Sequence, residues 1–224
     1  MSLWREVLDE LRQVVLGRGG ALDAVLPPVL FVIVQALWSF EAAMWSSLGV
    51  ALAIGIMRLI RGHSVLYALG GVVGVLIAIG LTLLLGGEEN FFLPGLLTGA
   101  LTVLLCFISV VARRPLVAWT SFIARRWPRE WYWHPRVRPA YAEVTLFWGF
   151  YFLARLGAQW FLYQEQAAAQ LAWLNLMLGW PATIVLLILS YLYGTWRLRV
   201  LGGPSVEEFK TGQDPPWESQ RRGF

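Results

Sequence analysis

The stretch YAEVTLFWGFYFLARLGAQWFLY, residues 141–163, decides how the rest of the chain is interpreted. It is long enough to cross a lipid bilayer as one helix, since such a crossing takes about 20 residues. Arg155 lies deep within it, and a charged side chain at that depth costs about 3 kcal/mol or more. A charge inside a membrane is usually paired or functional, so we expect other helices to enclose Arg155.

Arg155 shares one helical face with polar and aromatic side chains, namely Trp148, Tyr151, Gln159 and Tyr163. The other faces carry mostly Leu, Phe, Ala and Val. A helix with such a stripe turns it toward neighbouring helices and its apolar sides toward lipid. We favour this buried, paired interpretation. The alternative is that Arg155 extends to the outer headgroups and pairs with nothing inside the bundle.

The composition indicates a polytopic membrane protein. Of the 224 residues, 58% are hydrophobic and 14% are charged, whereas soluble domains carry about 25% charged residues. The net charge of +4 does not indicate a nucleic-acid partner, because the basic residues flank hydrophobic segments, where they set topology and meet anionic lipids. Cys106 is the only cysteine, which excludes an internal disulfide and a cysteine-cluster metal site.

The hydrophobic runs predict an all-α fold, a membrane bundle of six transmembrane helices. We place these at about residues 26–43, 46–60, 66–85, 91–111, 141–163 and 171–193. Apolar residues at helical spacing in the first 16 positions predict an amphipathic N-terminal helix. The expected parts are therefore an amphipathic helix at 1–20, a six-helix membrane domain at 21–200 and a polar, disordered cytoplasmic tail at 201–224.

A shorter apolar segment follows the fourth span. It runs from Leu116 to Ile123 and is followed by Arg125, Arg126 and Arg129. This length cannot cross a bilayer, so we expect a short interfacial helix at headgroup level.

The distribution of basic residues predicts the orientation. Of the 18 Lys and Arg residues, all except Arg155 lie in the termini, around the loop between the second and third spans, or between the fourth and fifth spans. Cytoplasmic segments carry such an excess. We therefore expect six crossings with both termini in the cytoplasm. The acidic side chains Glu41, Glu88, Glu89 and Glu165 then face the outside.

Several motifs resemble one known family. They are GGALDAVLPPVLFVIVQALW, RGHSVLYALGGVVGV, EENFFLPGLL, RRPLV and RPAYAEVTLFWGFYFLARLGAQWFLY. This pattern is similar to the bacterial membrane family catalogued as domain of unknown function 3159, over about residues 16–199. The family is also distantly similar to the intracellular septation protein A group. The resemblance implies a multi-pass protein of the bacterial inner membrane with about six helices and no assigned chemistry, and it assigns no catalytic residues to this chain.

No nucleotide, hydrolase or zinc-protease motif occurs in the sequence, so we expect no enzyme, no cofactor and no metal. The polar residues expected inside the membrane are Arg155, Gln159, Gln35, Glu41 and Asn175. An Arg155–Glu41 pair would offset part of the cost of burying the arginine. These residues form either a packing network or a ligand site that opens outward.

Three functions remain open. The first is a scaffold or accessory subunit that acts through membrane lipids, a protein partner or a second copy of the chain. The second is a small transporter or channel with Arg155 on its path, which requires a water-filled cavity. The third is a binder of a lipidic cofactor, which requires an apolar cleft lined by tryptophans.

Overall fold

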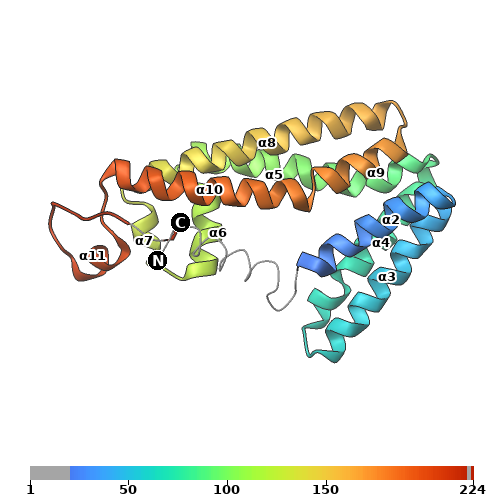
Figure 1. Ribbon diagram of the computed structural model, residues 1–224, viewed down its shortest axis with the longest axis horizontal. Coiled ribbons are helices and arrows are strands. Elements are labelled where there is room, and N and C mark those ends of the chain that lie inside the picture. Colours follow the sequence, from blue (N-terminus) through green and yellow to red (C-terminus); the bar gives the residue numbers. More distant parts are fainter. Residues whose placement is uncertain (1–20, 221–222) are drawn as a thin grey trace. The chain divides into compact units, whose positions relative to one another are not determined.

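The computed structural model describes residues 21–220 and 223–224, so the predicted N-terminal helix at 1–20 lies outside the described residues. Every element within the described residues is a helix, which confirms the all-α fold (Figure 1). In chain order they are α2 Ala21–Leu37, α3 Phe40–Ile60, α4 Val65–Leu85, η1 Glu88–Phe92, α5 Leu93–Val111, α6 Leu116–Arg125, α7 Arg129–Tyr132, α8 Arg138–Gln164, α9 Ala168–Met177, α10 Trp180–Leu201 and α11 Val206–Thr211.

The described residues divide into two compact units. The first consists of the described residues up to Thr98 together with Leu156–Thr183, and the second consists of Gly99–Arg155 and Ile184–Phe224. The boundaries fall inside α5, α8 and α10. The sequence predicts a single membrane domain over 21–200, and it contains no linker at these points.

In the first unit, α2, α3, α4 and α9 pack around an aromatic core (Figure 1). The rings of Phe31 and Phe91 stack with centroids 5.1 Å apart, and Phe40 meets Phe91 edge-on at 5.8 Å. Edge-to-face and offset-stacked pairs add to the free energy gained by burying each ring. This core joins helices that are far apart in the sequence.

The first two predicted spans are divided differently in the structure. The sequence predicted a break near residues 44–45, whereas α2 ends at Leu37 and α3 begins at Phe40. Ser39 sets this boundary because its hydroxyl accepts a hydrogen bond from the Ala42 backbone N–H at 3.1 Å, which caps α3. Glu41 therefore lies in the first turn of α3 and not at the far end of the first span.

In the second unit, α6, α7, α8 and α10 enclose three fully buried aromatic side chains, those of Trp131, Tyr132 and Tyr141. The predicted short segment after the fourth span is indeed a helix, α6. Its first turn is attached to α8, since the Val117 N–H donates to the Thr145 hydroxyl at 3.2 Å. The location of α6 at a membrane surface stays a prediction.

The segment after α10 differs from the disordered tail that its polar composition suggested. Ser205 and Glu208 form a reciprocal capping box that starts α11. The indole N–H of Trp131 donates to the Pro204 carbonyl at 2.8 Å, and the Phe224 ring stacks on Tyr141 with centroids 4.3 Å apart. Contacts with the buried aromatic core therefore order residues whose own composition does not favour structure.

Four helical segments within the described residues are long and apolar enough to cross a membrane: Phe40–Ile60, Val65–Leu85, Glu88–Val111 and Ala168–Leu201. Two apolar helices are shorter, Leu26–Leu37 and Leu116–Arg125. Helix α8 has 27 residues, but its charged, amide and aromatic polar residues make it less apolar than these four. The structure thus supports a membrane protein, and the number six remains a prediction.

Candidate functional site

Two of the predicted intramembrane residues meet directly. The side-chain amide of Gln159, on α8, donates to the Asn175 carbonyl oxygen, on α9, at 2.6 Å. Gln159 is buried, with 5% of its surface exposed. A buried amide without a partner is costly, whereas two amides that bond to each other largely offset their desolvation. The pair therefore holds α8 to α9 within the first unit.

A second polar contact lies one turn further along α8. The hydroxyl of Tyr163 donates to the side-chain oxygen of Asn90 at 2.7 Å. Asn90 is buried, and its amide group donates to the backbone carbonyl of Gly86. The sequence analysis did not single out Asn90, because it belongs to GGEEN, a short acidic loop at residues 86–90. The signal that could have identified Asn90 is its position immediately before Phe91 and Phe92, two aromatic residues that pack against the core.

The other three predicted residues lie elsewhere. Gln35 is half-buried on α2, and Glu41 is exposed on α3. Within the described part of the chain, no hydrogen bond joins either of them to the Gln159–Asn175 pair. Arg155 is half-buried on α8 and belongs to the second unit. The proposed Arg155–Glu41 pairing stays a prediction.

The second unit contains an ion pair that the sequence did not single out. The Arg197 guanidinium donates to both carboxylate oxygens of Glu143, at 2.6 and 2.7 Å, and the Tyr193 hydroxyl donates to the same carboxylate at 2.8 Å. Bidentate arginine–carboxylate pairs fix geometry as well as adding energy. The pair joins the start of α8 to the end of α10. The two residues are 54 positions apart, and their spacing carries no local signal.

Phe224 occupies a closely fitted place in the second unit. The Arg125 Nε donates to the Phe224 carbonyl oxygen at 3.0 Å, while the ring stacks on Tyr141. The ring also lies against Gly194 of α10, where a Cβ atom would overlap it. A glycine is therefore required at 194 for this close approach.

Titration behaviour near α7 reflects burial. Desolvation raises the pKa of Tyr132, and its hydrogen bond with Ser121 at 3.2 Å partly opposes this. Desolvation lowers the pKa of His134, and the nearby Arg136 charge lowers it further. The Arg136 backbone N–H donates to His134 Nδ1 at 3.3 Å, which suits the neutral imidazole.

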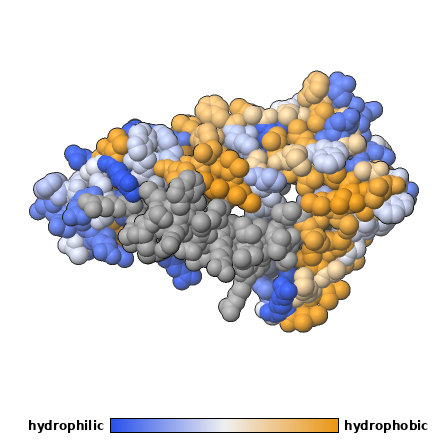
Figure 2. Space-filling view, in the orientation of Figure 1, coloured by the Kyte–Doolittle hydropathy of each residue, from blue (hydrophilic) through white to orange (hydrophobic). Residues whose placement is uncertain are grey.

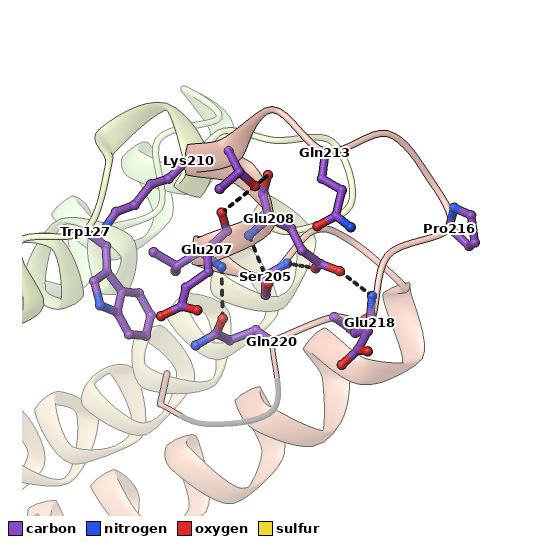
Figure 3. Close-up of a pocket in the computed structure, with 12 residues that line it drawn as sticks. Trp127, Ser205, Glu207, Glu208, Lys210, Gln213, Pro216, Glu218 and Gln220 are labelled. Carbon is purple, nitrogen blue, oxygen red and sulfur yellow. Dashed lines mark hydrogen bonds between the residues drawn. The ribbon is translucent and has the colours of Figure 1, made fainter.

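A pocket of about 780 Å³ lies beside α11 (Figure 3). Its lining includes three carboxylates and one ammonium group, from Glu207, Glu208, Glu218 and Lys210. Both carboxylate oxygens of Glu208 accept backbone hydrogen bonds. One accepts from the Ser205 N–H and the other from the Glu218 N–H, both at 2.7 Å. The described residues contain no group of three or more His, Cys, Asp or Glu that could hold a metal ion.

The geometry thus shows apolar helices joined by internal polar contacts. The family model described as "Protein of unknown function (DUF3159)" matches residues 16–197. No curated protein and no solved structure matches the chain. The distant similarity to the septation protein A group stays a prediction. Because the match covers well over half of the sequence, the chain belongs to the DUF3159 family of proteins of unknown function.

Proposed function

We propose that the protein is a non-catalytic scaffold or accessory subunit of the bacterial inner membrane that acts through protein or lipid contacts. The observation that carries this proposal is the contrast between its polar and apolar groups. The buried amide of Gln159 is engaged by Asn175, whereas only 17% to 22% of an 18-residue apolar window in each candidate span is buried within the chain. The apolar surface is therefore what remains available for binding.

The apolar surface is most extensive on α4. Large side chains that are about half exposed or more follow this helix, including Leu66, Val73, Leu76, Ile77 and Leu84. Figure 2 shows the hydrophobic colour over α2–α4. Soluble monomers rarely expose contiguous apolar areas of this kind, and such areas indicate lipid or partner contacts. This surface suits a protein embedded in lipid that presents helix faces to a partner or to a second copy.

We infer six crossings with both termini in the cytoplasm. Helix α8 is 27 residues long, which is about 40 Å at 1.5 Å per residue and more than a bilayer core requires. Adding α2 and α8 to the four candidate spans gives the even number that the distribution of basic residues requires.

A small transporter or channel is the second candidate. It is favoured by Arg155, a half-buried charge on a helix that is long enough to cross the membrane. This function requires water to reach the polar residues of α8 and α9. The scaffold requires these residues to stay dry. The two functions therefore differ in a property that chemical labelling measures directly.

The test uses the single-cysteine variants Gln159→Cys and Asn175→Cys, each in a Cys106→Ser background. On the scaffold proposal, a water-soluble thiol reagent added to both sides of the membrane leaves both variants unmodified. Thr211→Cys, at an exposed position on α11, is the positive control and reacts once the reagent reaches it. Rapid modification of Gln159→Cys or Asn175→Cys would contradict the scaffold proposal and support the transporter.

A second measurement tests the contacts themselves. A photo-reactive amino acid replaces Ile77, which is 52% exposed on α4. The proposal predicts one dominant cross-linked product, either a protein of discrete mass or one lipid class. Products in proportion to the bulk membrane lipids would contradict a specific contact at this face.

A further inference from the structure

The turn between α3 and α4 carries a compact basic and aromatic group, which consists of Arg58, Arg61, His63 and Tyr67. We use the name α3–α4 turn for the segment from Arg58 to Tyr67, which carries these four side chains. The two helices that it joins are each long and apolar enough to cross a membrane. A turn between two spans lies at the level of the lipid headgroups. Its chemistry therefore decides which headgroups it meets.

The turn is held in shape by close packing of the two helices. Gly55 allows this approach, because a Cβ atom there would lie 3.1 Å from the Ala68 carbonyl oxygen. Gly62 has a φ of +79°, which favours glycine and reverses the chain. The Ser64 hydroxyl then accepts from the Tyr67 N–H at 3.4 Å and starts α4. The basic side chains thus extend from a defined backbone.

Aromatic contacts hold the arginine and the histidine together. The Arg58 guanidinium carbon lies 4.8 Å from the centroid of the Tyr67 ring, a cation–π contact. The ring of His63 stacks on the same tyrosine at 5.5 Å, and His63 Nδ1 lies 3.2 Å from the Arg58 carbonyl oxygen. The guanidinium charge is therefore held in a defined position at the turn.

Within the part of the chain that the structure describes, no ion pair compensates the positive charge of the α3–α4 turn. No Asp or Glu occurs between Glu41 and Glu88 in the sequence. Within the described residues, no carboxylate forms an ion pair with Arg58 or Arg61. An anionic oxygen ligand would supply the missing negative charge and would accept hydrogen bonds from the guanidinium groups.

Apolar side chains border the turn on both helices. Ile60, at the end of α3, is 81% exposed, and Leu66, at the start of α4, is 88% exposed. A soluble anion would gain nothing from these side chains. An amphiphilic anion would contact them with its acyl chains and the arginines with its headgroup.

We propose that the α3–α4 turn binds an anionic phospholipid. Its phosphate is held by Arg58 and Arg61, and its acyl chains contact Ile60 and Leu66. The inference rests on the proposed function, because it requires the ends of α3 and α4 to lie at the membrane surface. The inference specifies which class of membrane lipid the protein binds at the α3–α4 turn.

The test measures binding of phosphatidylglycerol and of phosphatidylcholine to the full-length protein in detergent, by native mass spectrometry. The wild type should bind phosphatidylglycerol more tightly. Basic residues near an anionic surface are worth about a factor of five each in affinity. Arg61→Gln should therefore weaken the binding of phosphatidylglycerol about fivefold. The double variant Arg58→Gln/Arg61→Gln should weaken this binding about 25-fold. Phosphatidylcholine binding should not change.

Lys210→Gln is the matched control, because it removes one positive charge from exposed α11, outside the candidate spans. Equal lipid affinity in the wild type and the double variant would overturn the inference, and so would an equal loss in Lys210→Gln. Glycerol phosphate that binds as tightly as the lipid would also overturn it, since the apolar border would then be unused. Arg61 is exposed, so its single variant supplies the result if the double variant does not fold.

The outcomes also separate this inference from the proposed function. If Gln159→Cys and Asn175→Cys stay unmodified while the arginine variants keep their lipid, only the lipid site is wrong. If either cysteine variant reacts while the arginine variants lose the lipid, the lipid site is correct but the protein is a transporter and not a scaffold.

Discussion

Gly194 on α10 lies directly against the ring of Phe224, and a side chain at 194 would occupy the space of that ring. The same ring stacks on Tyr141, with the two planes 8° from parallel. The glycine and the aromatic ring therefore form one packing unit that attaches the segment after α10 to the helices.

Gly194→Ala should detach Phe224 from the second unit. Alanine favours a helix by about 1 kcal/mol over glycine, so any destabilisation comes from the overlap with the ring. We expect faster proteolysis between residues 201 and 224 and a weaker near-ultraviolet dichroism signal from the aromatic core.

Gly157→Ala on α8 is the matched control, because nothing lies within 4 Å of a Cβ atom there. It should leave proteolysis unchanged. If Gly194→Ala behaves like Gly157→Ala, the ring of Phe224 is not held as described.

Gln159→Leu should destabilise the first unit by about 1–2 kcal/mol, because it leaves the Asn175 side chain without its amide partner. Asn175→Leu should have an effect of the same size. The variant with both leucines should be less destabilised than the sum of the two single variants, since no polar group is then left without a partner. Reversible unfolding in mixed detergent gives these free energies, and strictly additive losses would contradict the pairing.

The second unit should lose stability as the pH falls below about 6.5, the usual pKa of histidine. Burial and Arg136 lower the pKa of His134 in the folded protein, so the unfolded chain binds a proton first. The contribution of His134 to the stability of the second unit is complete above a pH of about 6.5. It is lost as the pH falls through the pKa of His134 in the folded protein. The thermal midpoint at about pH 7.5 and about pH 5.5, on either side of that value, measures it. His134→Gln should reduce the difference between the two midpoints.

The apolar runs were sufficient to predict the helical class, because their lengths match a bilayer crossing. The α2–α3 boundary was not readable from them, since Ser39 stands between Trp38 and Phe40 in a continuous apolar run and acts only through its cap. The contacts of the two units were also hidden. Asn90 and Tyr163 are 73 positions apart, and Arg125 and Phe224 are 99 apart. Only folding brings such residues together.

The same limit explains the tail and part of the candidate site. Polar composition argued for disorder after residue 201, but Trp131 and Tyr141 supply partners that composition does not reveal. For the intramembrane residues, helical periodicity was sufficient to place Gln159 on an inward face. It did not identify Asn175 as the partner of Gln159, because a face specifies a direction and not a neighbour.

Glu88→Cys, in a Cys106→Ser background, should react with a membrane-impermeant thiol reagent added outside intact cells. Glu88 begins η1, at the start of the candidate span Glu88–Val111 and after α4, and the basic residues place this end of the span outside. Thr211→Cys, on α11, should react only after the cells are lysed. If Glu88→Cys requires lysis and Thr211→Cys does not, the orientation is the reverse. Reaction of both variants in intact cells would place η1 and α11 on the same side and so exclude the three crossings between them that the proposed topology requires.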